Sequence, residues 1–278
     1  MKKKILMPTD FSKNAWHAMT YAIELFKNNT CEFYILNAFQ PESYALDSMM
    51  VSEPGEKYYD LCKKKSEEGL ERVFQMLKER DDNPNHTFNT VSKLGLLIDA
   101  IDGLIEKKDI ELIIMGTKGI SDSKAILGTN TVFVMESIDT CPVLAIPKDS
   151  FFKEFKEIVF PTNYEMPIKK RELQHLIDIA KAVDTSVRFL HVSPSDDLNQ
   201  NQKENQKLLS EYFWDVEHSF HTLHSGKVNV ALSNFVESRG SDMIAFINSK
   251  HNFFNYLFSE SLVKDLGYYS KIPILVLH

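Results

Sequence analysis

The chain has 278 residues, a length that fits about two domains of ordinary size. It is 43% hydrophobic and 26% charged with a net charge of -7, which is typical of a soluble globular protein and gives no basic footprint for nucleic acid. No stretch approaches the roughly 18 apolar residues of a membrane span, and Pro8 interrupts the first apolar run too early for a signal peptide. We therefore expect a cytoplasmic protein that binds neither nucleic acid nor membranes.

The chain begins with a strand, a helix and a second strand. Ile5–Met7 is a short continuous apolar run, the pattern of a strand buried on both faces. Apolar residues at helical spacing over 15–26 predict a helix, and Ser12 is placed to be its N-cap. The apolar run that ends at Asn37 predicts the next strand.

The middle of the first half is less regular. Gln40–Gly55 has no clean pattern, which leaves two readings open, a mobile flap and an ordinary surface loop. A long helix with a solvated, lysine-rich face is expected to begin at Lys63. A helical stripe follows over 97–105, then an apolar strand at Leu112–Met115, and Pro142 opens a last strand, where a missing N–H donor is tolerated.

The second half repeats the first, block by block and in the same order. Lys4–Asp10 corresponds to Glu157–Asn163, Phe33 to Arg188 with the register uncertain by one residue, Leu112–Lys118 to Ile244–Lys250, and Cys141–Pro147 to Ile272–His278. The seam lies near residues 148–155. The repeat predicts two domains, 1–150 and 151–278.

Alternating strands and helices predict the fold class: α/β, with two doubly wound five-stranded parallel-sheet domains in tandem. In such folds ligands bind at the carboxyl ends of the strands, near the switch in strand order. Asp10 and Gly116 each follow the end of an apolar strand. We therefore expect both residues at the same edge of the first sheet.

A glycine-containing loop carries the main functional signal. It reads Gly116-Thr117-Lys118-Gly119, then eight residues, then Gly128-Thr129-Asn130-Thr131, and a helical pattern follows. Glycines allow close approach of the backbone to phosphate oxygens, the threonine hydroxyls and the helix N-terminus favour an anion, and Lys118 adds a cation. A simple turn is the alternative reading of the glycines alone.

These residues resemble the universal stress protein family over essentially the whole chain. That family has Gly-x-x-Gly, about nine residues, then Gly-Ser/Thr after its fourth strand, where this chain has a spacer of eight. Pro8-Thr9-Asp10 at the first strand end and Cys141-Pro142-Val143 at the last strand also match. The resemblance implies a Rossmann-like, adenine nucleotide alpha hydrolase-like fold. It also implies ATP or AMP as ligand, with Mg²⁺ as an optional companion, although some members of the family bind ATP and others do not.

The resemblance also assigns roles to residues of the first half. Asp10 would meet the ribose or base, with Thr9 beside it, and the backbone near Ala38 would face adenine. Met115 and Gly116 would line the ribose and phosphate side. The phosphates would be held by the remaining loop residues, Gly119, Gly128, Thr129, Asn130 and Thr131, with Lys118 as the nearby cation.

The second half departs from this pattern. Asn163 replaces Asp10, Asn248–His251 replaces the glycine pair, and Ser259–Ser261 replaces the later Gly-Thr-Asn. The loop holds the aromatic residues Phe253, Phe254, Tyr256 and Phe258, which favour packing or an interface. We therefore expect a degenerate second domain that pairs with the first, and one nucleotide per chain. A homodimer through the last strands is an alternative partner arrangement.

Three functions remain open from the sequence. The first is a stress-response protein that binds ATP or AMP and acts as a sensor or regulator. The second is a slow ATPase, for which Asp122 is a weak candidate base. The third is a nucleotide-free interaction scaffold.

Cysteine and histidine patterns point to no other chemistry. The three cysteines have no metal or redox spacing, so Cys31 and Cys141 are expected to be buried free thiols. His218, His221 and His224 are three residues apart, but their segment looks like a strand, whose alternation would separate them. We expect no metal site there.

Overall fold

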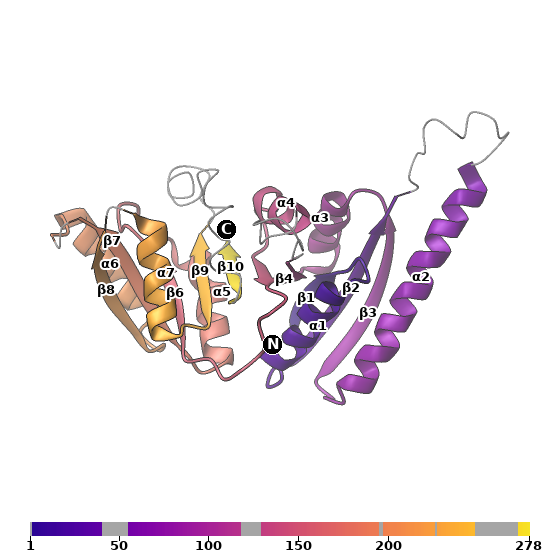
Figure 1. The fold of residues 1–278 in the computed structure, drawn as a ribbon, viewed down its shortest axis with the longest axis horizontal. Helices are drawn as coiled ribbons and strands as arrows, with labels where there is room; N and C mark the ends of the chain where they lie inside the picture. Colours follow the sequence, from indigo (N-terminus) through magenta and orange to yellow (C-terminus); the bar gives the residue numbers. More distant parts are fainter. Residues whose placement is uncertain (1, 41–54, 118–128, 195–196, 226, 248–271) are drawn as a thin grey trace.

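The computed structural model describes residues 2–40, 55–117, 129–194, 197–225, 227–247 and 272–278. The first half forms the elements β1 Lys3–Pro8, α1 Lys13–Leu25, β2 Cys31–Phe39, α2 Gly55–Arg80, β3 His86–Leu94, α3 Leu97–Lys108, β4 Leu112–Gly116, α4 Thr129–Ser137 and β5 Val143–Ile146. The second half forms β6 Glu157–Pro161, α5 Lys170–Ala182, β7 Ser186–Ser193, α6 Gln200–Tyr212, β8 His218–His224, α7 Val228–Arg239, β9 Met243–Ile247 and β10 Ile274–Leu277. Figure 1 shows the two halves side by side.

The ten strands form one sheet in the order β3-β2-β1-β4-β5-β10-β9-β6-β7-β8. Each half contributes five parallel strands with β1 or β6 in the middle, which confirms the predicted α/β class. The two sets meet where β10 pairs antiparallel with β5, with Leu275 opposite Leu144. In the first half, β2 and β3 lie on one side of β1, and β4 and β5 lie on the other. The switch point of this half is therefore between β1 and β4.

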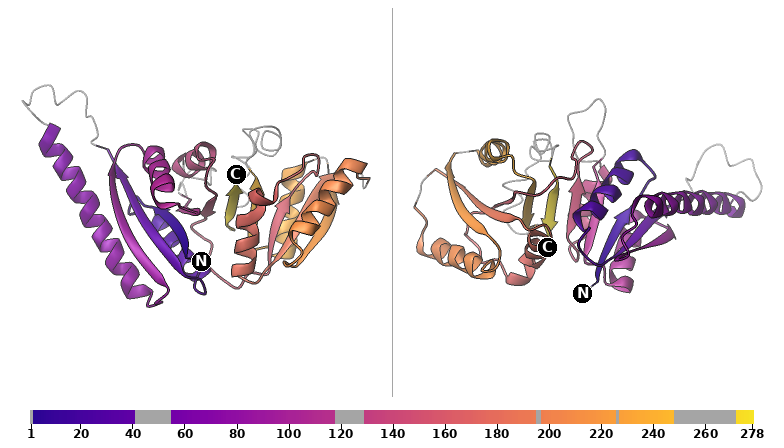
Figure 2. Two further views of the ribbon diagram at one scale, coloured as in Figure 1. Left: turned by 180° about the vertical axis from the view of Figure 1, so that it is seen from behind. Right: turned by 90° about the horizontal axis from the view of Figure 1, so that it is seen from below.

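Helices cover both faces of the sheet (Figure 2). One core contains buried residues of α1, α2, α5 and α6, and the other contains buried residues of α3, α4 and α7. Successive residues of β5 alternate between the cores, with Leu144 in the first and Val143 in the second. The same alternation separates Ile5 from Leu6 in β1, so the apolar run of that strand is buried on both faces as predicted.

The first helix begins as the sequence indicates, but the second does not. Ser12 caps α1, since its hydroxyl oxygen accepts a hydrogen bond of 3.2 Å from the Ala15 N–H. The long helix α2 starts at Gly55, eight residues before the predicted Lys63. In this early part of α2, the ring of Tyr59 packs against Phe39 at 6.1 Å between centroids. This tertiary contact stabilises helical turns whose sequence has no clear apolar pattern. Residues 41–54 of the predicted flap or loop lie outside the described residues.

Strand pairing corrects two registers of the internal repeat. Ile5 lies opposite Phe33 and Ile158 opposite Val187, so Phe33 corresponds to Val187 and not to Arg188. In the same way, Leu112 pairs with Ile5 and Met243 pairs with Ile158. Leu112 therefore corresponds to Met243 and not to Ile244. A shift of one residue is hard to detect in strands that are apolar on both faces, since the hydrophobic pattern hardly changes.

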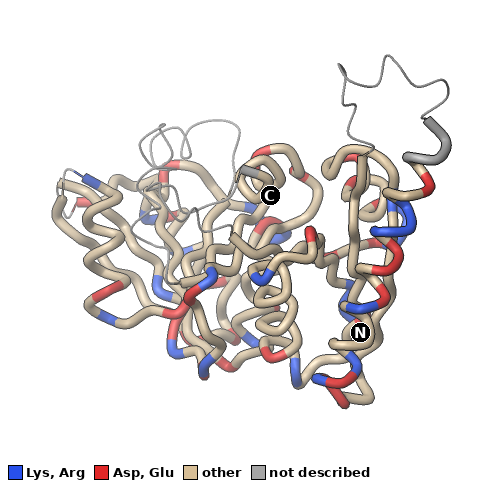
Figure 3. Tube along the Cα trace, turned by 45° about the vertical axis from the view of Figure 1, so that its right-hand side comes forward, with Lys and Arg blue, Asp and Glu red and all other residues tan. Residues whose placement is uncertain are grey.

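Charges and thiols follow the sequence expectations. Basic and acidic positions alternate along α2 (Figure 3). On the exposed surface of this helix, Lys63 pairs with Glu67 at 4.0 Å. Cys31 and Cys141 are buried free thiols, and burial raises the pKa of each to about 12. Thiols held in this way are unreactive near neutral pH.

Candidate functional site

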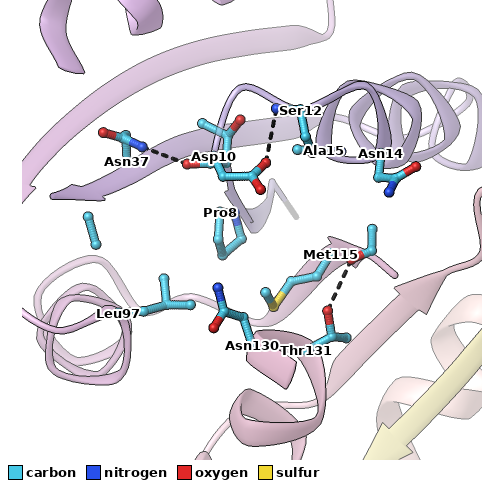
Figure 4. A pocket seen from close by; sticks show the side chains of 13 residues that line it. Pro8, Asp10, Ser12, Asn14, Ala15, Asn37, Leu97, Met115, Asn130 and Thr131 are labelled. Atoms are coloured by element: carbon cyan, nitrogen blue, oxygen red, sulfur yellow. Dashed lines mark hydrogen bonds between the residues drawn. The ribbon is translucent and has the colours of Figure 1, made fainter. Parts of the chain in front are cut away.

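A cavity of about 330 Å³ lies at the carboxyl ends of β1, β2 and β4. Its described lining residues are Pro8, Thr9, Asp10, Ser12, Asn14, Ala15, Asn37, Ala38, Leu97, Met115, Gly116, Asn130 and Thr131. Asp10 and Gly116 both belong to this lining, so the fold brings them to one edge of the sheet as expected from the topology. In Figure 4, Asp10 and Ser12 lie on one side of the cavity and Asn130 and Thr131 on the other.

The loop between β1 and α1 fixes the carboxylate of Asp10. Its Oδ1 accepts a hydrogen bond of 3.0 Å from the Ser12 N–H, and the Thr9 hydroxyl oxygen accepts one of 3.0 Å from the Phe11 N–H. Phe11 adopts a left-handed backbone conformation with φ 63° between these two turns. Asn37 of β2 also holds this loop in place, because its side-chain amide donates a hydrogen bond to the Thr9 carbonyl at 2.7 Å.

The opposite wall is formed by the end of β4 and the first turn of α4. The Thr131 hydroxyl donates to the Gly116 carbonyl at 3.0 Å, and Thr131 is only 2% exposed. This hydrogen bond joins the first turn of α4 to the end of β4, and the phosphate contact expected for Thr131 stays a prediction. The backbone N–H groups in the first turn of α4 have no partner within the helix and remain the anion-favouring feature of this wall.

Gly116 has a structural role that the sequence did not indicate. A β-carbon at this position would lie 2.3 Å from the carbonyl oxygen of Asn14 at the start of α1. The glycine is thus required for close packing of α1 on the end of β4, whether or not a phosphate approaches it.

Seven of the predicted site residues line the cavity. They are Thr9, Asp10, Ala38, Met115, Gly116, Asn130 and Thr131. Lys118, Gly119 and Gly128 lie outside the described residues, and Thr129 is described only as the first residue of α4. The ligand contacts assigned to all of these residues stay predictions.

Asn37, Ser12, Asn14 and Leu97 also line the cavity and were not among the predicted site residues. Asn37 had a visible signal, since it is a polar residue directly after the apolar run Phe33–Leu36. The other three lie at the beginnings of helices α1 and α3, and their position depends on how those helices pack.

The second half builds the same loop with different side chains. The Thr162 hydroxyl oxygen accepts from the Tyr164 N–H at 3.2 Å, Asn163 Oδ1 accepts from the Glu165 N–H at 3.1 Å, and Tyr164 has φ 57°. His191 stands at the position of Asn37 and bonds through Nδ1 to the Thr162 carbonyl at 3.0 Å. A carbonyl only accepts, so Nδ1 carries the proton.

The glycine of β4 has no counterpart in the second half. Strand pairing places Ile247, not Asn248, at the position of Gly116. Helix α5 begins at Lys170, about one turn later than α1 relative to its preceding strand, and Ile247 packs against the core on that side of the sheet. Residues 248–271, which include the replaced phosphate loop and the aromatic residues, lie outside the described residues.

The segment with three regularly spaced histidines is a strand. His218–His224 is the edge strand β8, as predicted. Within the described part of the chain, no group of three or more His, Cys, Asp or Glu side chains could hold a metal ion.

Two doubly wound α/β units with a cavity at the switch point place the protein in the Rossmann-like class. The model of the Universal stress protein family matches residues 1–147, and the chain belongs to this family. It is 28% identical over 148 residues to Universal stress protein MJ0531 of Methanocaldococcus jannaschii, a match that covers 52% of this chain and 82% of the relative.

Solved structures show the same fold over both halves. A universal stress protein from Archaeoglobus fulgidus superposes with a TM-score of 0.68 at 18% identity, over 98% of this chain and 95% of the other. A proposed universal stress protein from Pseudomonas aeruginosa gives a TM-score of 0.62 at 15% identity, over 99% and 92% of the two chains. None of the described helices is long and apolar enough to cross a membrane.

Proposed function

We propose that the first domain binds one adenine nucleotide, ATP or AMP, and that the protein acts as a sensor or regulator and not as an efficient enzyme. The observation that carries this proposal is the cavity that lies between the Asp10 carboxylate and the first turn of α4. A carboxylate on one wall and N–H groups without a partner within helix α4 on the other match the two polar ends of a nucleotide.

The lining provides a partner for each part of such a ligand. Asp10 is exposed and its Oδ2 is bonded to no described residue, so it can accept hydrogen bonds from ribose hydroxyls. The backbone near Ala38 would meet the adenine edge, and Met115 offers apolar contact. The volume of about 330 Å³ lies at the lower end of the range for small-ligand pockets, which is roughly 300–1,000 Å³.

A magnesium ion would depend on the nucleotide more than on the protein. Asp10 is the one carboxylate among the described lining residues, and its Oδ1 is already bonded to the Ser12 N–H. Mg²⁺ commonly keeps several waters and is held through substrate phosphates with one or two carboxylates. It would therefore accompany a triphosphate and would not bind here alone.

The two alternative functions, a slow ATPase and a nucleotide-free scaffold, would give the first cavity different roles. For a slow ATPase, a base must orient water, and Asp10 is the single titratable group in the described lining. The candidate Asp122 lies outside the described residues. For a nucleotide-free scaffold, the β5–β10 pairing would be the main functional feature, and we propose that this pairing joins the two domains within one chain.

Calorimetric titration of the wild type and Asp10→Asn with AMP and ATP tests the proposal. Asparagine preserves the turn, because Asn163 makes the same bond at the corresponding position of the second half. We expect one site per chain and an affinity at least about tenfold lower in D10N, the effect of losing a bond to a charged acceptor.

Asp102→Asn, an exposed carboxylate of α3, is the matched control and should bind as the wild type does. No binding of the wild type up to millimolar nucleotide would overturn the proposal, as would equal affinity in D10N.

A further inference from the structure

The second domain contains a cavity of its own, at the carboxyl ends of β6 and β7. Its volume is about 360 Å³, slightly more than that of the first cavity. Its described lining residues are Pro161, Thr162, Asn163, Glu165, Leu190, His191, Val192, Ser193, Pro194, Asp197, Gln202 and Val228. We infer that this cavity binds a small organic cation with several N–H donors, such as a primary amine or a guanidine, and not a nucleotide. This inference stands independently of the function proposed for the first domain.

The charge of the lining favours a cation. Glu165 and Asp197 are the charged residues of the described lining, both are exposed, and no lysine or arginine is among the lining residues. The first turn of α7 reaches the cavity at Val228, but a helix N-terminus carries only about half a positive charge. Two full negative charges therefore outweigh it, and a phosphate would be repelled.

His191 supplies an acceptor deeper in the cavity. It is 5% exposed, and its Nδ1–H is bonded to the Thr162 carbonyl. In the neutral ring, Nε2 is then an acceptor, and none of the described residues donates to it. A ligand N–H that donates to Nε2 would therefore add a hydrogen bond at this point of the cavity.

The two amide side chains of the described lining, Gln202 and Asn163, both make hydrogen bonds within the protein. Gln202 donates from Nε2 to the Asn163 carbonyl at 2.8 Å and accepts through Oε1 from the Asn199 N–H at 3.0 Å. Asn163 Oδ1 accepts from the Glu165 N–H. The lining also presents three acceptors to a ligand, the two carboxylates and His191 Nε2. A ligand that meets all three must present hydrogen-bond donors and positive charge.

The test is calorimetric titration of the full chain with agmatine, putrescine and spermidine at about 0.15 M salt, which screens non-specific attraction. Glu165→Gln with Asp197→Asn removes both charges and keeps the side-chain shapes. We expect at least one of the three amines to bind one equivalent per chain, and this double variant to weaken that binding at least tenfold.

Two further variants separate a site from a general charge effect. Glu67→Gln with Glu71→Gln makes the same change in net charge on the exposed surface of α2 and should leave the affinity within about twofold. His191→Asn keeps an amide donor for the Thr162 carbonyl, as Asn37 does for Thr9, but removes the second acceptor. It should weaken amine binding about threefold to tenfold, with an unchanged melting curve.

Three results would overturn the inference. They are no binding of any of the three amines up to about 10 mM, equal affinity in the Glu165 and Asp197 double variant, and an equal loss in the α2 control. None of these results bears on nucleotide binding by the first domain, which is measured separately with D10N.

Discussion

Gly116 lies so close to Asn14 that a β-carbon on the glycine would be 2.3 Å from the asparagine carbonyl oxygen. The end of β4 and the start of α1 are therefore in backbone contact beside the first cavity. A substitution of Gly116 changes this packing before it can change any ligand contact. For this reason Asp10, whose turn asparagine can reproduce, is the better position for a test of binding.

Replacement of Gly116 by alanine should lower the free energy of unfolding by about 1–3 kcal/mol, the usual cost of overpacking. Gly103 provides the matched control, since it lies in helix α3 and a β-carbon there would meet nothing within 4 Å. Gly103→Ala should raise the free energy of unfolding by about 0.5–1 kcal/mol, because alanine favours a helix. Urea unfolding measures both, and equal effects of the two substitutions would contradict the close contact.

Glu157 is the centre of a buried polar cluster at the start of β6. Its carboxylate accepts hydrogen bonds from Arg239 at 2.7 and 2.8 Å, from Ser241 at 2.7 Å and from Arg188 at 3.2 Å. Burial opposes ionisation, but these bonds outweigh it and lower the pKa of Glu157 below its ordinary value. The ionised form therefore stabilises the fold above about pH 4.3, the unfolded pKa of glutamate, and this contribution is lost as the pH falls through the lower folded pKa.

Glu157→Gln should accordingly destabilise the protein by about 1.5–3 kcal/mol at pH 7, the range for hydrogen bonds to a charged group. The difference between wild type and variant should shrink as the pH falls below about 4. Glu217→Gln, whose exposed carboxylate contacts Arg188, should cost less than about 1 kcal/mol. Urea unfolding at several pH values measures the free energy of unfolding of the wild type and of each variant. If the difference between the wild type and Glu157→Gln did not change with pH, the role of the Glu157 charge would be contradicted.

The pairing of the two domains can be tested by a disulfide. Leu144 of β5 lies directly opposite Leu275 of β10, a separation of about 4.5–5.5 Å between Cα atoms in an antiparallel pair. Leu144→Cys with Leu275→Cys should oxidise to a disulfide within a single chain, which mass spectrometry of the non-reduced protein detects.

Leu144→Cys with Leu277→Cys, displaced by two residues along β10, is the control and should remain reduced. A disulfide between two chains in the first variant would favour the homodimer instead.

The sequence predicts the architecture well because its signals are local. Continuous apolar runs mark the strands, helical stripes mark α1 and α3, and Ser12 caps a helix through a bond three residues away. The order of blocks in the two halves predicts the repeated fold. Register within a doubly buried strand is not a local signal, and both register errors occurred in such strands.

The candidate site is only partly visible in the sequence. Asp10 and Gly116 could be placed at one edge because strand ends meet there, but the reason for Gly116 is a tertiary contact with Asn14. The hydrogen bond from the Thr131 hydroxyl to the Gly116 carbonyl likewise depends on how α4 packs. Asn37 and His191 show how two unlike residues perform one task, since both donate to the carbonyl of the threonine that follows the central strand.

A crystal structure of the chain grown with saturating AMP tests the central claim most directly. We predict density for one nucleotide per chain, in the first cavity between Asp10 and the first turn of α4, and none in the second cavity. A first cavity without nucleotide under these conditions, or AMP bound beside Glu165 and Asp197, would contradict the account.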